Sequence, residues 1–155
     1  MSSEKSMVLN GRTLPLQTEH RSSLGDFIRA CGINSVHLAC EHGVCGSCNV
    51  LVAGQCVRSC LTLAQSCEDT TITTLEGLQD DLAQRLRAAF NSFHALQCGF
   101  CTPGVFLSAY ELLSSGEMVN EASVREHLAG NICRCTGYQG IVEAILCVAN
   151  SNPVV

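Results

Sequence analysis

Most of the twelve cysteines in this chain of 155 residues lie in two tightly spaced groups. In the first, CEHGVCGSC, the spacing is C-x4-C-x2-C and runs from Cys40 through Cys45 to Cys48. The second combines the segment QCGFCTPG with the segment NICRCTG further along the chain. The N-terminal sequence has no apolar run and no twin arginine, so we expect no export signal and a cytoplasmic protein. Structural disulfides are rare in that reducing compartment, which favours metal binding by the thiols.

The first cysteine group has the spacing of a plant-type [2Fe–2S] loop, which needs a fourth thiolate from elsewhere in the chain. Three downstream cysteines are candidates: Cys56, Cys60 and Cys67. A hairpin that turns near Ala53–Gly54 would place Cys56 opposite Leu51 and return Cys60 to the side of Cys48. Cys56 would then lie about 10 Å along the ladder from that point, at roughly 3.3 Å per residue. Cys67 lies beyond the point of closest return. We therefore predict that Cys60 is the fourth ligand.

Two glycines, Gly43 and Gly46, are interleaved with the cysteines of the first group. A loop around an iron–sulfur cluster turns its backbone N–H groups toward the sulfurs and often needs positive φ angles, which glycine adopts without steric penalty. A zinc knuckle also contains C-x2-C, but the x4 spacing and the glycines favour iron–sulfur. A Rieske centre is excluded, because the C-x-H formed by Cys40 and His42 has no C-x2-H counterpart.

The second cysteine group supplies four further thiols: Cys98, Cys101, Cys133 and Cys135. Each pair precedes a predicted helix, so we expect two helix N-termini to stabilise an anionic, thiolate-ligated centre. The C-x-C pair suits a zinc knuckle poorly, because paired zinc ligands are typically two to four residues apart. The group therefore predicts a second iron–sulfur site.

Short strands and one helix are expected in the first half of the chain. Asn10–Gly11 separates two apolar runs, which is a strong hairpin signal. Ser22 or Ser23 can cap a helix that Gly32 ends. The segment NVLVAGQCVRSC predicts a second hairpin, and TTITTL predicts a short strand.

Helical periodicity replaces this pattern from Asp81 onward. Thr102–Pro103 fits a helix start, with the threonine as N-cap and the proline in the first position. Asn120 can cap the next helix, and Gly130 can end it. A last helix is expected over residues 139–150.

The change of pattern near residue 75 predicts an α+β protein of two domains, residues 1–74 and residues 75–155, the second with four helices. Charged residues make up only 15% of the chain and the net charge is −5, without a basic cluster, which disfavours nucleic-acid binding. The longest charge-free run, 88–110, contains a proline and several polar residues, so we expect no membrane span. The low charge fits a well-packed monomer and a subunit whose low-charge faces are covered by partner chains equally well, so composition alone leaves both open.

The two cysteine groups together resemble one protein family. CEHGVCGSC followed by RSC, and QCGFCTPG followed by NICRCTGYQGI, are similar to the small iron–sulfur subunit of molybdenum hydroxylases, the family of xanthine dehydrogenase and carbon-monoxide dehydrogenase. The resemblance covers about residues 7–148. It implies an N-terminal β-grasp ferredoxin-like domain, a C-terminal four-helix domain and one [2Fe–2S] cluster in each. It also supports Cys60 as the fourth ligand of the first cluster.

The resemblance further implies partners and a role. A large subunit would carry a molybdopterin cofactor, as the cytosine dinucleotide, and a medium subunit would carry FAD, in a heterotrimer that can pair into a dimer of heterotrimers. Gln97 and Cys135 would lie against the pterin, and the ferredoxin-like cluster would face the flavin. The chain would relay electrons in an oxidoreductase that uses water to hydroxylate a small substrate (an N-heterocycle, a purine, an aldehyde or carbon monoxide) and would hold no catalytic residue of its own.

Two other functions stay open at this point: a free-standing double-cluster ferredoxin and a structural zinc protein. Low charge argues against the ferredoxin, because soluble ferredoxins usually steer their partners with a strong charge asymmetry. Ala39 and Asn49 depart from the family pattern, in which glycine and threonine are usual. Phe100 and Tyr138 are expected to pack around the second site. The remaining cysteines are expected to be buried, reduced thiols: Cys31, Cys56, Cys67 and Cys147.

Overall fold

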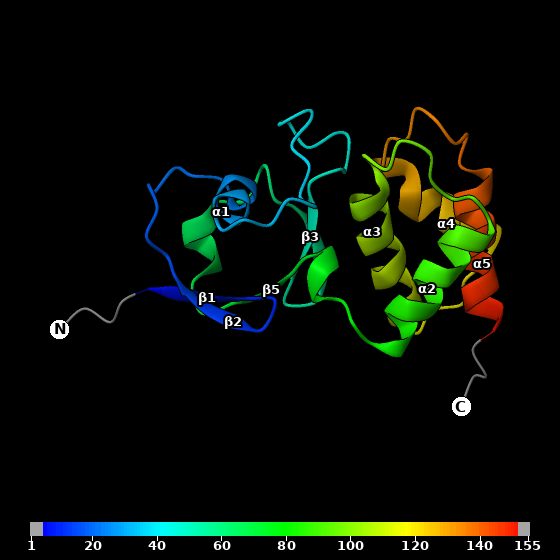
Figure 1. Ribbon diagram of the computed structural model, residues 1–155, viewed down its shortest axis with the longest axis horizontal. Coiled ribbons are helices and arrows are strands. Elements are labelled where there is room, and N and C mark those ends of the chain that lie inside the picture. Colours follow the sequence, from blue (N-terminus) through cyan, green and yellow to red (C-terminus); the bar gives the residue numbers. More distant parts are fainter. Residues whose placement is uncertain (1–4, 152–155) are drawn as a thin grey trace.

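The strands and the long helices of the chain occupy two regions that lie side by side (Figure 1). The computed structural model describes residues 5–151. Within them, the N-terminal region contains a five-stranded sheet and one α-helix, and the C-terminal region contains four α-helices. Across the same residues no helix combines the length and the hydropathy needed to cross a membrane.

A mixed sheet forms the N-terminal region. Its strands are β1 (Ser6–Leu9), β2 (Arg12–Pro15), β3 (Asn49–Val52), β4 (Gln55–Arg58) and β5 (Thr71–Thr73), in the order β2-β1-β5-β3-β4. Parallel pairing joins β1 to β5, and the other neighbours are antiparallel. Asn10 (φ 49°) and Gly11 (φ 80°) form the first hairpin turn. The predicted hairpin is confirmed, because both positions have the positive φ that such a tight turn requires.

Helix α1 (Leu24–Ala30) packs against the sheet. Ser23 caps it, since its Oγ accepts a hydrogen bond from the Asp26 N–H at 3.0 Å. Gly32, with a φ of 87°, follows the last turn and ends the helix as predicted. The buried apolar side chains of the helix join a core with β1, β3 and β5: Leu24, Phe27 and Ile28.

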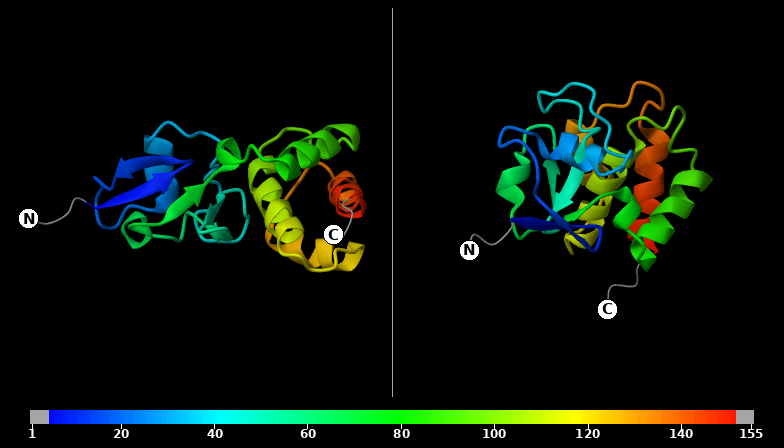
Figure 2. Two further views of the ribbon diagram at one scale, coloured as in Figure 1. Left: turned by 90° about the horizontal axis from the view of Figure 1, so that it is seen from below. Right: turned by 60° about the vertical axis from the view of Figure 1, so that its left-hand side comes forward.

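The C-terminal region consists of α2 (Asp81–Ser92), α3 (Thr102–Ser114), α4 (Glu121–His127) and α5 (Gln139–Asn150). These helices surround a second core, and in the left view of Figure 2 they form a ring in which α5 is seen nearly end-on. Leu86, Leu107 and Ile145 are among its fully buried side chains. Leu51 of β3 also belongs to this core, so the sheet packs directly against the helices.

Two helix boundaries differ from the sequence prediction. Cys101, and not Thr102, occupies the N-cap of α3, because its carbonyl already accepts the first helical hydrogen bond from the Val105 N–H at 3.0 Å. Helix α4 ends at His127, earlier than expected, and passes into a 3₁₀ turn over Leu128–Gly130. Tighter i to i+3 bonds of this kind are common at the ends of α-helices.

Candidate metal centres

The first cysteine group lies on the loop between α1 and β3, at the upper edge of the molecule in Figure 1. The N–H of Cys45 donates to Sγ of Cys40 at 3.4 Å. Gly43 (φ 86°) and Gly46 (φ 74°) have the positive φ angles that the sequence predicts. Hydrogen bonds from the backbone N–H groups of His42 and Cys45 lower the pKa of the Cys40 thiol to about 6. The loop therefore favours the thiolate, which is the form that binds metal.

The second hairpin brings Cys60 toward this group. Strands β3 and β4 pair with Leu51 opposite Cys56, which confirms the predicted register. Just beyond the paired strands, the N–H of Ser59 donates to the Cys48 carbonyl at 3.3 Å. Burial, and then contact with the Cys48 thiol, raises the pKa of Cys60 to about 11. Cys60 thus lies beside Cys48, and this position supports the prediction that it is the fourth ligand.

The other two candidates for that position contact their own surroundings. Sγ of Cys56 lies 3.7 Å from Oγ of Ser108 on α3, and burial raises the pKa of this thiol to about 11. Cys67 is buried in the core of the sheet region, with its Sγ 3.8 Å from the Leu63 carbonyl. Both thiols therefore serve as packing groups.

The second cysteine group comes from two loops that meet at the same edge of the molecule (Figure 1). Sγ of Cys135 lies 3.7 Å from Sγ of Cys98. Burial, and then the neighbouring Cys133 thiol, raises the pKa of Cys101 to about 12. The four thiols are thus paired across the two loops, Cys98 with Cys135 and Cys101 with Cys133.

Hydrogen bonds fix the Cys133 side of this group. Burial alone would raise the pKa of Cys133, but hydrogen bonds from Thr136 outweigh it and leave the pKa below its ordinary value. Oγ1 of Thr136 lies 3.0 Å from Sγ of Cys133. Oη of Tyr138 accepts from the Cys133 N–H at 2.8 Å and donates to the Asn131 carbonyl at 2.9 Å. The prediction that Tyr138 packs at the second site is confirmed.

The helix N-termini lie less symmetrically around the second group than the sequence predicts. Cys101 is itself the N-cap of α3. In contrast, residues 136–138 separate Cys135 from the first residue of α5. A helix dipole acts mainly within the first turn, so α3 favours an anionic centre more directly than α5 does.

The thiols of each group are arranged in pairs. Among residues 5–151, no three His, Cys, Asp or Glu side chains gather closely enough to hold one metal ion. A [2Fe–2S] cluster has two irons that share four thiolates, so two pairs of cysteines match its needs. Four such pairs are present: Cys40 with Cys45, Cys48 with Cys60, Cys98 with Cys135, and Cys101 with Cys133. This donor set fits two [2Fe–2S] clusters.

Backbone contacts join the two cysteine groups. The N–H of Ile132 donates to the Cys45 carbonyl at 2.8 Å, which links the residue before Cys133 to a cysteine of the first group. The approach is close, because a Cβ added at Gly46 would collide with the Gly130 carbonyl. The two regions therefore touch where their cysteines lie.

An aromatic contact adds a second link between the regions. Nδ1 of His37 lies 2.6 Å from the Phe100 carbonyl, and the two rings stack with centroids 4.6 Å apart. His37 shortly precedes the first cysteine group, and Phe100 lies between Cys98 and Cys101. Phe100 was expected to pack around the second site, but the stacking contact of its ring is with His37 of the sheet region.

Known proteins share this sequence and this fold. A family model described as "[2Fe-2S] binding domain" matches residues 74–146. The chain is 48% identical over 139 residues to the nicotine 6-hydroxylase small subunit of Paenarthrobacter nicotinovorans, covering 89% of this chain and 84% of that protein. It is 38% identical over 154 residues to the caffeine dehydrogenase subunit gamma of Pseudomonas sp. (strain CBB1), covering 96% and 92%. A chain in the crystal structure of quinoline 2-oxidoreductase from Pseudomonas putida 86 superposes with a TM-score of 0.87 at 41% identity, over 96% of this chain and 94% of that chain.

The chain belongs to the small [2Fe–2S] subunits of the molybdenum hydroxylases. It is an iron–sulfur electron-transfer subunit of an oxidoreductase complex. Similar proteins are named as subunits beta and gamma of dehydrogenases. The expected α+β fold, with a ferredoxin-like sheet followed by helices, is confirmed.

In this small subunit the two residues expected at the pterin lie together. Nε2 of Gln97 donates to the Cys135 carbonyl at 3.1 Å. Gln97, Cys98 and Cys135 are all exposed. Contact with a pterin stays a prediction, and the exposure of this corner supports it.

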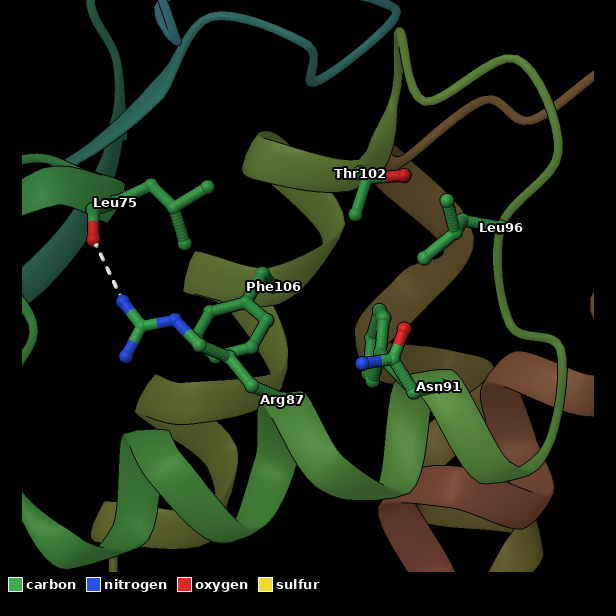
Figure 3. A pocket seen from close by; sticks show the side chains of 7 residues that line it. Leu75, Arg87, Asn91, Leu96, Thr102 and Phe106 are labelled. Atoms are coloured by element: carbon green, nitrogen blue, oxygen red, sulfur yellow. Dashed lines mark hydrogen bonds between the residues drawn. The ribbon is translucent and has the colours of Figure 1, made fainter.

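A cleft of about 270 Å³ borders the loop that carries Cys98 and Cys101 (Figure 3). The Arg87 guanidinium lies along one side, where Nη2 donates to the Leu75 carbonyl at 3.1 Å and the group sits 5.5 Å from the centroid of the Phe106 ring. The other lining residues drawn in Figure 3 include Asn91, Leu96 and Thr102. The loop that carries Cys98 and Cys101 therefore has an open cleft on one side.

Sequence reasoning missed the polar residues between the two regions of the small subunit. Arg58 contacts three segments, and Asn49, Ser108 and Asn131 are buried and bonded to one another. A signal was available, because Asn49 and Asn131 are polar residues close to cysteine motifs in a chain with few charges. Their position in the sequence does not reveal which side chains these two asparagines bond to.

The expectation for the leftover cysteines was half right. Cys67 is buried and Cys56 is partly buried, but Cys31 and Cys147 are exposed. Cys31 caps the end of α1, and Cys147 lies on the outer side of α5. Apolar periodicity does not separate these surface positions from the core, because cysteine occurs in both.

Proposed function

We propose that this small subunit relays electrons, one at a time, from a molybdopterin centre in a large partner subunit to FAD in a medium partner subunit. The observation that carries the proposal is the hydrogen bond between Ile132 and Cys45, which puts the two cysteine groups in backbone contact. When bound, each [2Fe–2S] cluster accepts and releases single electrons. The ligands in this proposal are Cys40, Cys45, Cys48 and Cys60 for one cluster, and Cys98, Cys101, Cys133 and Cys135 for the other.

The residues of the chain supply placement and hydrogen bonding. Residues 1–74 act as one cluster-binding domain and residues 75–155 as the other. The Cys45 N–H points at Sγ of Cys40, and the Thr136 hydroxyl lies against Sγ of Cys133. Hydrogen bonds to ligand sulfurs tune the reduction potential of an iron–sulfur centre.

The exposed residues near the two cysteine groups support an assignment of one partner subunit to each region. Gln97 and Cys135 lie together at the surface of the helical region, which favours this region as the one that meets the molybdopterin, as its cytosine dinucleotide. The sheet region then faces FAD, in a heterotrimer that can pair into a dimer of heterotrimers. Exposed apolar side chains border both groups, as expected of docking surfaces: Val44 and Leu61 at the first, and Leu96, Phe100 and Ile132 at the second.

We also propose that the complex hydroxylates an N-heterocycle in the cytoplasm. Nicotine, caffeine and quinoline, which appear in the names of similar proteins, are N-heterocycles. Purines in general, aldehydes and carbon monoxide are the alternatives from the wider family. Oxygen from water enters the substrate, and two electrons and two protons leave it.

Anaerobic co-purification of the chain with the products of its neighbouring genes tests the relay. We expect a stable three-subunit particle with about four irons per small subunit, two for each cluster. Substantially fewer irons after reconstitution, or zinc in place of iron, would overturn the proposal. A lone small protein that keeps its iron would support the free-standing ferredoxin instead.

The substrate class is tested on the same particle. Nicotine, caffeine, quinoline, an aldehyde and carbon monoxide are added separately under anaerobic conditions, and bleaching of the iron–sulfur absorbance is followed. An N-heterocycle should bleach the visible absorbance fastest. Bleaching by the aldehyde or by carbon monoxide alone would contradict this part of the proposal.

A further inference from the structure

Arg58, the last residue of β4, joins three segments of the chain. Its Nε donates to the Gly43 carbonyl at 3.1 Å, and its Nη2 donates to the Gly130 carbonyl at 2.6 Å. Its Nη1 donates to Oδ1 of Asn49. Gly43 lies inside the first cysteine group and Asn49 directly follows it, whereas Gly130 belongs to the helical region. One half-buried side chain therefore spans the boundary between the two regions.

Buried side chains extend this contact into a continuous network. Nδ2 of Asn49 donates to Oγ of Ser108 at 2.8 Å, and that hydroxyl donates to Oδ1 of Asn131 at 2.9 Å. Nδ2 of Asn131 in turn reaches the Gly46 carbonyl at 3.5 Å, back in the first cysteine group. Polar groups in such a buried network are costly to leave unpaired, so the network holds the two regions in one arrangement.

The chemistry of this position requires arginine. A guanidinium presents its donors in a rigid plane, so a single side chain can reach three oxygens in fixed directions. A lysine keeps the charge but has one compact ammonium on a flexible stem. The guanidinium also lies close against the helical side, because a Cβ added at Gly130 would collide with Nη2 of Arg58 and push this end of the side chain away.

We propose that Arg58 is a positioning residue that fixes the spacing between the two cysteine groups. This inference rests on the proposed two-cluster relay and adds the device that sets the distance the electron must cross inside the chain. The magnetic coupling between two reduced clusters falls steeply with their separation, so it reports this spacing directly. The Ile132 amide, which bonds to Cys45 across the same boundary, reports it independently.

The test compares Arg58→Gln and Arg58→Lys in the whole complex, with Arg21→Gln as the matched control. Arg21 belongs to the same region, but its exposed side chain pairs only with Glu19 among the described ion pairs. Low-temperature EPR of the fully reduced complex measures the coupling, and hydrogen exchange measures protection of the peptide that contains Ile132. Arg58→Gln should weaken the coupling and speed exchange of that peptide about tenfold. The control should match the wild type.

The lysine variant separates positioning from charge. If the planar guanidinium sets the spacing, Arg58→Lys should behave like Arg58→Gln in both measurements. Wild-type coupling in Arg58→Lys would assign the effect to charge and overturn the inference. Wild-type coupling and exchange in Arg58→Gln would overturn it as well.

Iron content separates this inference from the proposed function. A wild-type complex with too few irons overturns the relay itself, whereas full iron with unchanged coupling in Arg58→Gln overturns only the role of Arg58. Should Arg58→Gln lose iron, Gly130→Ala decides, because it displaces Nη2 from outside both cysteine motifs. Hydrogen exchange of the Ile132 peptide in Gly130→Ala is measured whether or not this variant keeps its iron. Faster exchange than in the wild type supports the positioning role of Arg58, and wild-type exchange overturns it.

Discussion

The two cysteine groups of this small subunit are built in different ways. The first lies on one loop and is closed by a hairpin, and its backbone donors lower the pKa of Cys40 to about 6. The second is assembled from two loops that α3 and α4 separate along the chain, and burial raises the pKa of Cys101 to about 12. One pair of its thiols, Cys98 and Cys135, is exposed. A local loop makes the first group, and the packing of distant helices makes the second.

This difference teaches that the two groups depend on different parts of the fold. The first needs the register of β3 and β4, and the second needs the core of α2 to α5. Changes aimed at one part should therefore spare the other group. The two groups are not fully independent, because the Ile132 N–H bonds to the Cys45 carbonyl across the boundary between the regions.

Removal of a ligand from the first group should have the largest effect. Cys45→Ser is expected to lose the ferredoxin-like cluster and to block reduction of the flavin, while the other centre persists. Iron analysis and EPR of the complex measure this. The matched control is Cys31→Ser, an exposed cysteine outside both groups, which should keep both signals. Two iron–sulfur signals at full intensity in Cys45→Ser would show that Cys45 is not a ligand.

Truncation of the two cores should separate the proposed domains. Leu86→Ala in the helical core and Leu24→Ala in the sheet core each remove a fully buried side chain and should cost about 2–5 kcal/mol. Hydrogen exchange of the isolated full chain should speed up mainly in the region that carries the change. Equal loss of protection in both regions for both variants would argue against two domains.

The close contact of the two groups can be broken at one glycine. Gly46→Ala combines a strained positive φ with a collision against Gly130 and Asn131, and should lower the free energy of unfolding by about 2–4 kcal/mol. Gly54→Ala is the control, because its φ is similarly positive but no atom lies within 4 Å of the added Cβ. It should cost about 1 kcal/mol. Equal costs in urea unfolding would mean that the contact is loose.

A carboxylate at the junction of the regions should give the smallest effect. Burial tends to raise the pKa of Glu76, but hydrogen bonds from Ser35 and Thr74 outweigh it and leave the pKa below its ordinary value. A lowered folded pKa means that this stabilisation is present above the unfolded pKa and is lost as the pH falls through the folded value. Glu76→Gln should therefore lower the free energy of unfolding by about 1 kcal/mol or less at neutral pH. The variant should also lose less stability than the wild type as the pH falls.

Urea unfolding at several pH values between neutral and acid measures this dependence. The exposed Glu117→Gln is the control and should leave the pH profile as it is in the wild type. A wild-type profile in Glu76→Gln would mean that the junction carboxylate contributes nothing.

Much of the local structure was predictable from particular residues. Asn10–Gly11 predicted the first hairpin, and Ser23 predicted the cap of α1, because turn and cap chemistry acts over a few neighbouring residues. Asn120 likewise caps α4 as expected. The start of α3 was misplaced by one residue, because a pattern cannot show which carbonyl accepts the first helical bond.

The sequence by itself determined the kind of site. The spacing of eight thiols in two groups, together with Gly43 and Gly46 at positions that need positive φ, favoured iron–sulfur chemistry over a zinc knuckle. The hairpin register that returns Cys60 to Cys48 also followed from local geometry. These features involve neighbouring residues, whose relative positions the chain geometry nearly fixes.

Only the tertiary structure decided how the two groups face each other. The Arg58 acceptors Gly43 and Gly130 are 15 and 72 residues away in sequence, in different regions. The pairing of Cys98 with Cys135 likewise joins residues 37 positions apart. Contacts of this kind depend on how the sheet and the helices pack, and no spacing pattern encodes the direction in which a packed side chain points.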